Sequence, residues 1–421
     1  MGRNARDNRP RVKPLIKVEL SEKNKKARII ALVIFIAIAI ISFTVFLFSL
    51  FEEEDGWNEI EAQDSMIGLT DEIVLTYNLG ASEASASSEH KAIQRIYSEI
   101  LVKAHKLFNL YESFDGFNNL YYINRHIGEE IVVDELLYDA LTLIKEYNEN
   151  LIYLEPVYSH YEELFMSEDD VYAKDLDAYY SVETEQYFSS VIDFASDRSK
   201  VSLELLDGCR VRLNVSEDYK EFAIENSITS FIGIANLRNA FIVDEVAEAL
   251  LEKNYRYGSI VTSDGYMRNL DGENRYSYNI FDKQGNMIYT SSTIDYKGDI
   301  SLVMFKDYPF SQLDYRRLYQ YGDGVCATLY LDTETGKYKS AVDTFYAYSY
   351  TDGCAEVALK ALPLYANEEL DTAVLNSFIT DGLDFVWHEG SVVRYTDSDI
   401  NVNLPYTYDE VSYSKEFYPN S

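Results

Sequence analysis

The sequence predicts an α+β domain behind a single N-terminal transmembrane helix. Three features support this prediction: an uncharged apolar run near the N-terminus, segments with helical periodicity, and short segments in which apolar and polar residues alternate. The chain has 421 residues, of which 47% are hydrophobic. Because that proportion can bury a substantial core, most of the chain is expected to fold.

Residues 29–51 form the predicted transmembrane helix. These 23 residues carry no charge and, as a helix, would span roughly 35 Å, enough to cross a bilayer. The preceding 28 residues hold ten basic and three acidic side chains, whereas Glu52, Glu53, Glu54 and Asp55 follow the run. Because positive charge stays on the cytoplasmic side, we expect the N-terminus inside the cell and the remaining chain outside.

A cleaved secretory signal is the alternative for this segment. Its apolar region would be about 7 to 15 residues long and would end in small residues. Here the run ends in Phe46, Leu47, Phe48, Ser49, Leu50 and Phe51. We therefore expect an uncleaved, single-pass anchor in the cell membrane.

Composition divides the rest of the chain. Residues 1–28 form a basic cytoplasmic tail, 52–64 an acidic linker, 65–396 an extracytoplasmic domain and 397–421 a polar C-terminal tail.

The formal net charge of −34 argues against nucleic-acid binding, which relies on Lys and Arg contacts to phosphates, and favours basic partners. The cysteines (Cys209, Cys326 and Cys354) form no CxxC pair, and their disulfide state is undecided.

The first part of the domain is predicted to be mainly helical. A strand within 67–78 and a small-residue loop at 80–88 come first. Apolar residues then recur at helical spacing from Ile93 to Tyr111. A second helix is expected over 136–147 after the capping residue Asp134, and a third near 183–194, within an acidic stretch that resembles an insertion.

The following residues change to a β pattern. Residues 201–205 and 211–215 alternate around Asp207 and Gly208, as in a β-hairpin. Further strands are predicted at 259–262, 276–282, 287–291, 300–305, 345–350 and 385–395, with helices at 239–253, 354–364 and 370–379. Mixed helices and hairpins are typical of the α+β class.

Common catalytic motifs are absent from the sequence. It contains no GxSxG, HExxH or GxxxxGK[ST] pattern, and the five histidines lack the spacing of metal ligands. The segment DTETG at 332–336 is compatible with an ordinary β-turn, because Asp, Thr and Gly favour turns.

Four segments together resemble the ApbE family of FAD:protein FMN transferases. HKLFNLYESFDGFNNLYYIN at 105–124 is similar to a flavin-side segment of many Gram-positive members. ANLRNAFIVD at 235–244 aligns with the family's GGIAKGYAVD, LYLDTETG at 329–336 with HIxDPxTG, and AEVALKAL at 355–362 with ADALATAL. The resemblance covers residues 65–395 and implies a mixed α+β fold. It also implies an extracytoplasmic enzyme that uses magnesium to split FAD and attach FMN to a Thr or Ser of another protein.

The resemblance further implies site residues. The candidate cofactor-binding residues are Tyr111, Asn119, Asn124, Asp332, Thr335 and Gly336. Asn239 and Leu329 stand where the family has a Lys and a His, so the catalytic positions are degenerate. Glu356 is the candidate metal ligand because it aligns with the family's Asp, and Lys360 replaces the family's Thr.

The departures from the family pattern affect its chemistry. Ala235 and Asn236 replace two glycines, which removes backbone freedom close to a ligand. Magnesium needs hard oxygen ligands, so the ammonium of Lys360 is unfavourable beside it. Glu356 and Lys360 are four residues apart on a predicted helix, and we expect them to form an ion pair that fills the vacated metal site.

These features predict a membrane-anchored extracytoplasmic protein that is catalytically inactive and serves in binding or as a scaffold. It would need no cofactor, and its partner would be an extracytoplasmic protein or the cell wall. Two alternatives are an active FMN transferase that requires FAD and magnesium, and a non-catalytic protein that binds a flavin or another small ligand.

Overall fold

The computed structural model describes residues 55–63, 71–82, 85–405 and 411–418. The predicted anchor at 29–51 and the basic tail lie outside these residues. Among the helices that are described, none combines the length and the apolar character needed to cross a bilayer. All described residues belong to one unit, residues 54–421.

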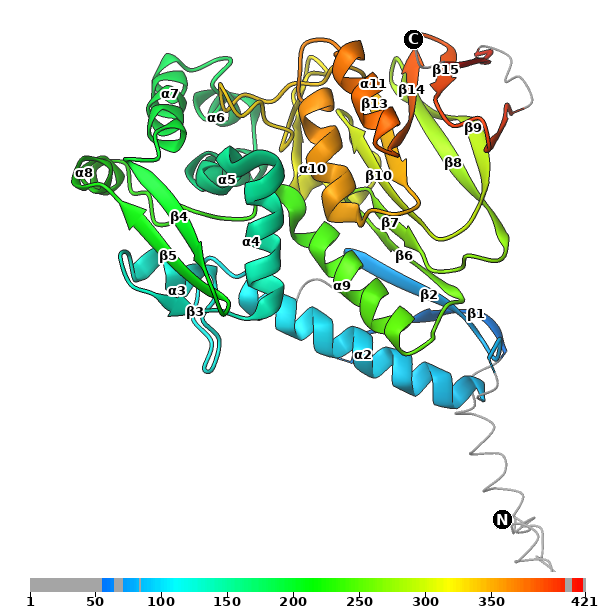
Figure 1. Cartoon of the computed structure of the whole chain (residues 1–421). Helices are drawn as coiled ribbons and strands as arrows, with labels where there is room; N and C mark the ends of the chain where they lie inside the picture. The colour runs from blue at the N-terminus through cyan, green and yellow to red at the C-terminus, as the bar shows by residue number, and fades with distance from the viewer. Residues whose placement is uncertain (1–54, 64–70, 83–84, 406–410, 419–421) are drawn as a thin grey trace, which may run out of the picture. The chain divides into compact units, whose positions relative to one another are not determined.

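A nine-stranded sheet forms the centre of this unit (Figure 1). Neighbouring strands pair antiparallel, except that the last two are parallel. The sequence prediction of mixed helices and mostly antiparallel strands is thereby confirmed. In sheet order the strands are β1 (Gly56–Ile60), β2 (Ile73–Leu79), β6 (Gly258–Thr262), β7 (Tyr266–Asn269), β10 (Ile300–Lys306), β13 (Thr344–Ser349), β14 (Asp384–Glu389), β15 (Val392–Tyr395) and β17 (Ser414–Phe417).

Both faces of the central strands are buried. Along β10, Val303 and Phe305 join the main core, whereas Leu302 and Met304 join a second core on the opposite face, as the two-residue period of a strand requires. The main core is covered by helices (Figure 1): α2 (Ala86–Leu107), α9 (Arg238–Glu252), α10 (Cys354–Tyr365) and α11 (Thr372–Thr380). The second core is closed by a three-stranded sheet of β8 (Arg275–Gln284), β9 (Met287–Lys297) and β16 (Asn401–Asn403).

A second group of elements lies beside the helical layer (Figure 1). In this group, Asp134 caps the helix that was predicted over 136–147, because its side chain accepts a hydrogen bond from the backbone N–H of Leu136. The predicted hairpin at 201–215 is also confirmed. The elements are α3 (Leu120–Arg125), α4 (Glu135–Asn148), η2 (Glu149–Leu154), α5 (Glu155–Phe165), α6 (Asp170–Asp175), α7 (Val182–Ser196), α8 (Glu217–Glu225), and a sheet of β3 (Ile131–Val132), β5 (Arg210–Val215) and β4 (Val201–Leu206).

Two ranges differ from the sequence-based expectation. The range 52–64, expected to be a linker, contains β1, and the polar range 397–421 contains β16 and β17. All four residues of β17 are exposed, and in β1 the side chains of Trp57 and Glu59 are exposed. Such edge strands are held mainly through backbone pairing, so their side chains give little apolar signal.

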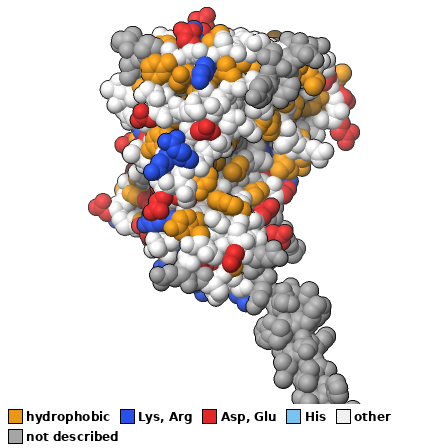
Figure 2. All heavy atoms as spheres, turned by 90° about the vertical axis from the view of Figure 1, so that its right-hand side faces the viewer, with side chains coloured by type: hydrophobic (Ala, Val, Ile, Leu, Met, Phe, Trp, Pro, Cys, Tyr) orange, Lys and Arg blue, Asp and Glu red, His pale blue; other side chains and the backbone are white. Residues whose placement is uncertain are grey.

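The surface on the side of β1, β8 and β9 is mixed in character. Figure 2 shows hydrophobic side chains between charged and polar ones over this side. Trp57 of β1 and Met287 of β9 are among the exposed hydrophobic residues. Scattered apolar side chains of this kind are usual on protein surfaces.

All three cysteines, whose disulfide state the sequence left undecided, are free.

Candidate functional site

A cleft of about 630 Å³ lies where the two groups of elements meet. Its walls come from the end of α2, one face of α5, the start of α9, and the residues around η4 (Gln312–Arg316). This volume is within the usual range for small-molecule sites.

One wall of the cleft is built around the carboxylate of Glu72. This side chain is only 4% exposed and lies just before β2. Arg238 donates to its Oε2 at 2.8 Å, Arg316 donates to its Oε1 at 2.5 Å, and Nη2 of Arg317 lies 3.2 Å from Oε2. Burial alone would raise the pKa of Glu72, but the arginines and Asn239 outweigh it and hold the pKa below the ordinary value.

Asn239 joins two carboxylates in this wall. Its Nδ2 donates to Glu72 Oε2 at 3.1 Å and to Asp264 Oδ2 at 2.9 Å. It is 2% exposed in the first turn of α9. Asn239, which the sequence comparison aligned with a Lys of the family, is therefore hydrogen-bonded to two acidic side chains and lies next to Arg238.

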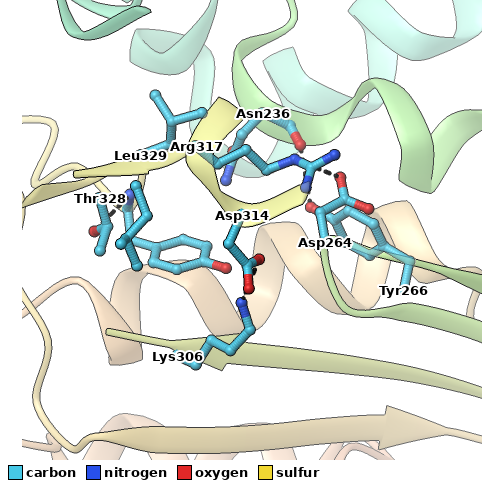
Figure 3. A pocket seen from close by; sticks show the side chains of 10 residues that line it. Asn236, Asp264, Tyr266, Lys306, Asp314, Arg317, Thr328 and Leu329 are labelled. Atoms are coloured by element: carbon cyan, nitrogen blue, oxygen red, sulfur yellow. Dashed lines mark hydrogen bonds and ion pairs between the residues drawn. The ribbon is translucent and has the colours of Figure 1, made fainter. Parts of the chain in front are cut away.

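A buried ion pair positions the arginines. Lys306 of β10 lies 2.7 Å from Asp314, and both side chains are almost fully buried. Asp314 also accepts from the backbone N–H groups of Phe310 and Ser311, which fixes the start of η4. Figure 3 shows this pair beside Arg317 and Asp264, around a small inner cavity of about 20 Å³, room for about one water molecule.

Leu329 lines both the inner cavity and the cleft, as do Asn236, Asp264 and Arg317. Leu329, which the sequence comparison aligned with a His of the family, is an apolar side chain at the cleft wall and offers no proton donor or acceptor.

The opposite wall is one face of α5. Glu155, Tyr158, Glu162 and Phe165 follow helical spacing and all line the cleft. Glu155 is 4% exposed, and Ser159 donates to its Oε1 at 3.0 Å. Burial, reinforced by the charge of Glu162, raises the pKa of Glu155 to about 8.

Ala235 has an unusual backbone conformation. Its φ of 52° lies in the left-handed region that favours glycine, and the residue lines the cleft. The loss of backbone freedom expected from the missing glycines stays a prediction, but the alanine is strained in this conformation.

The predicted residues of the 105–124 segment have different positions. Tyr111 lines the cleft and donates to Glu162 Oε2 at 2.6 Å. Asn119 is fully buried, where it caps α3 and donates to the carbonyls of Lys106 and Glu112. Asn124 is also buried. Its amide binds the backbones of Leu120, Phe231 and Ile232. Both asparagines therefore hold loops together.

Asp332, Thr335 and Gly336 lie together in a turn. Thr335 donates to Asp332 Oδ2 at 2.9 Å, and Lys339 lies 3.0 Å from the same oxygen. Gly336 has a φ of 67°, which explains its identity. These three residues do not line the cleft among the residues described.

The candidate metal ligand is held in an ion-pair cluster. Lys360 Nζ lies 2.7 Å from Glu356 Oε1 and 2.8 Å from Asp352 Oδ2, and Tyr147 donates to Glu356 Oε1 at 2.5 Å. Lys360 is 11% exposed. Burial alone would lower its pKa, but hydrogen bonds from Lys360 to Asp352 and Glu356 outweigh it and raise the pKa above the ordinary value. The Glu356–Lys360 ion pair expected from the spacing is present.

These residues do not fit a magnesium ion. Magnesium requires several oxygen ligands around one point, but an ammonium lies between the two carboxylates here. In the part of the chain that the structure describes, no group of three or more His, Cys, Asp or Glu side chains is placed to hold a metal.

Sequence reasoning missed most of the cleft. Glu155 could have been noticed, because it interrupts the apolar run LIYLEPVY at 151–158. Arg316 and Arg317 form a basic pair in a strongly acidic chain. Glu72 and Asp264 have no comparable signal, since only the fold brings them beside the arginines.

Comparisons with known proteins identify the fold. No protein-family sequence model and no curated protein sequence matches the chain. Among solved structures, the ApbE protein of Thermotoga maritima superposes with a TM-score of 0.53 at 13% identity, over 79% of this chain and 94% of that one. The flavin transferase ApbE of Vibrio cholerae gives a TM-score of 0.50 at 14% identity, over 79% and 93%. The described unit therefore has the α+β fold of ApbE flavin transferases.

Proposed function

We propose that this chain is a membrane-anchored extracytoplasmic binding protein that has the ApbE fold and does not cleave FAD. The observation that carries the proposal is the position of Lys360. Its ammonium forms ion pairs with both Glu356 and Asp352, so the carboxylate aligned with the family's metal ligand already has a cation. Without magnesium, the family's route to FAD cleavage lacks its activating ion.

Membrane anchoring rests on the sequence. The uncharged run at 29–51 and the basic flank before it support a single-pass anchor with the domain outside the cell. The partner would then be an extracytoplasmic protein, a cell-wall component or a small molecule.

An unpartnered polar atom favours ligand binding over a purely structural role. The hydroxyl of Tyr158 is buried without a hydrogen-bond partner in the structure, and Tyr158 lines the cleft but not the inner cavity. Buried polar atoms are normally satisfied, so this hydroxyl supports a bound molecule in the cleft. Asn236, Asp264 and Arg317 also carry unpartnered atoms, but these residues line the inner cavity as well, which has room for a water molecule.

The test is incubation of the full-length chain with FAD, with and without magnesium, followed by chromatographic detection of AMP. We expect no AMP release in either condition. The variant Glu356→Gln serves as a control, because any release that persists in it comes from a contaminant. Magnesium-dependent release of AMP by the wild-type chain alone would establish the active-transferase alternative.

A further inference from the structure

The α5 wall of the cleft combines acids with aromatic rings. Glu155 and Glu162 lie on one face of the helix together with Tyr158 and Phe165, and Tyr111 reaches Glu162 from the loop after α2. Phe108 adds a further ring. The arginines belong to the Glu72 wall, so the two walls have different chemistry.

Neither acid of the α5 wall has a cation. The hydrogen bonds to their side chains come from Ser159 and Tyr111. Within the described ranges, no Lys, Arg or His forms an ion pair with Glu155 or Glu162, whereas Glu72 has three arginine partners. A buried carboxyl without a cation is costly when it ionises.

A second observation points to a ligand at this position. Tyr158 is 4% exposed and lines the cleft, and its hydroxyl has no hydrogen-bond partner in the structure. The carboxyl of Glu155 is also fixed in place, because it lies against the backbone of Gly233. A Cβ at that glycine would be 1.8 Å from Glu155 Oε2.

The chemistry of these groups suits a primary ammonium. Such a group has three donors and no acceptor, which matches two carboxyls and a tyrosine hydroxyl. The rings of Phe108, Tyr111 and Phe165 supply the aromatic surroundings that favour a cation. An anionic group would be repelled by the acids.

We propose that the α5 wall of the cleft binds a primary ammonium group, carried by a free amine or by a lysine side chain of a partner protein. This inference rests on the proposed function only in taking the cleft as a binding site. The FAD assay and the amine assay below have separate readouts, so either can fail alone.

The test is calorimetric titration of the full-length chain with 1,5-diaminopentane, and with 1,5-pentanediol as a neutral analogue. We expect saturable binding of the diamine only. Glu155→Gln and Glu162→Gln should each weaken that binding by about tenfold or more, because each removes a carboxyl that would be ionised beside the bound ammonium. The matched control is Glu163→Gln, an exposed neighbour on the same helix that accepts from Tyr172 instead.

Proton release gives a second readout. The pKa of Glu155 is raised to about 8, so this carboxyl is mostly protonated at pH 7 and should lose its proton when an ammonium binds. The titratable groups that interact with the Glu155 carboxyl are Glu162 and Tyr158 on α5 and Tyr111 from the loop after α2. Arg238, on the opposite wall, acts on Tyr111 and favours a lower pKa of its hydroxyl. Heats measured in buffers of different ionisation enthalpy should show this proton, and Glu155→Gln should abolish it.

The source of the ammonium is distinguished by a third probe. A short peptide with one lysine is compared with the same peptide acetylated on that lysine. Binding of the unmodified peptide identifies a protein lysine, and binding of the diamine alone identifies a free amine. Equal binding of diamine and diol, no saturable binding of diamine or peptide up to about 10 mM, or undiminished binding to both Gln variants would overturn the proposal.

Discussion

Glu356 and Glu155 lie in similar local positions but have opposite electrostatic situations. Each lies in the first turn of a helix, and each contacts the side chain four residues later. For Glu356 that residue is Lys360, at 2.7 Å, and the carboxylate is neutralised within the chain. For Glu155 it is Ser159, at 3.0 Å, which donates a hydrogen bond but no charge. A single residue type at i+4 therefore decides whether the carboxyl is already paired or available to a cationic ligand.

The Glu356 cluster and the cleft also differ in whether their polar atoms have partners. The Glu356 cluster is closed by Lys360, Asp352 and Tyr147, and no ligand is needed to satisfy it. The cleft instead keeps buried polar atoms without partners, among them the Tyr158 hydroxyl. A closed ion-pair cluster and a cleft with unpartnered polar atoms are thus both present in one fold.

The largest expected effect comes from removing the cation of the Glu356–Lys360–Asp352 cluster. Lys360→Thr removes the cation between Glu356 and Asp352, which leaves two carboxylates facing each other. Because the cluster is partly exposed, we expect a loss of about 2 kcal/mol in the free energy of unfolding. Urea denaturation measures it. A variant as stable as the wild type would show that the ion pairs contribute nothing.

The next effect concerns the pH dependence of stability. The folded-state pKa of Glu155 is raised from 4.5 to about 8, so the stability linked to its proton is full at low pH and is lost as the pH rises through about 8. Glu155→Gln should remove this loss and be more stable than the wild type by about 1 to 2 kcal/mol at pH 8, with a smaller difference at pH 5. Denaturation at both pH values checks this, with Glu163→Gln as control.

A smaller effect is expected from adding a cation beside Glu155 in the α5 wall of the cleft. Ser159→Lys would place a cation four residues after Glu155, as Lys360 is placed after Glu356. We expect the new pair to stabilise the chain by about 0.5 to 1 kcal/mol and to abolish binding of 1,5-diaminopentane. Retained diamine binding in this variant, measured by calorimetry, would contradict the parallel between the two helices.

The smallest effect is expected at Ala235. Its φ of 52° is strained for alanine, and glycine has no such strain. The gain is partly offset by the greater freedom of glycine in the unfolded chain, so Ala235→Gly should stabilise by a few tenths of a kcal/mol, at most about 1. Thermal unfolding measures this difference, and a destabilised variant would show that the strain is absent.

Periodic elements were predictable because their signal is local. The helix with apolar residues from Ile93 onward, the Asp134 cap and the Glu356–Lys360 pair all follow from spacing along one element. The strand β1 was missed because it is short and its apolar and polar residues do not separate by face, since Trp57 is exposed together with Glu59. That the Glu356–Lys360 pair occupies the ancestral metal position stays a prediction.

The cleft was not predictable in the same way. Glu72, Glu155, Arg238 and Arg316 come from four distant segments, and only tertiary packing brings them to one cavity. Asn119 and Asn124 were candidates for flavin binding, but in the structure their amides bond to the backbone. Spacing along the chain could not distinguish an amide that binds a ligand from one that holds a loop.

The most direct test of the account is calorimetric titration of magnesium chloride into the full-length chain and into Lys360→Thr. The account predicts no saturable magnesium binding to the wild type, because Lys360 already neutralises Glu356, and measurable binding once that ammonium is removed. Saturable binding to the wild type that Glu356→Gln abolishes would contradict it.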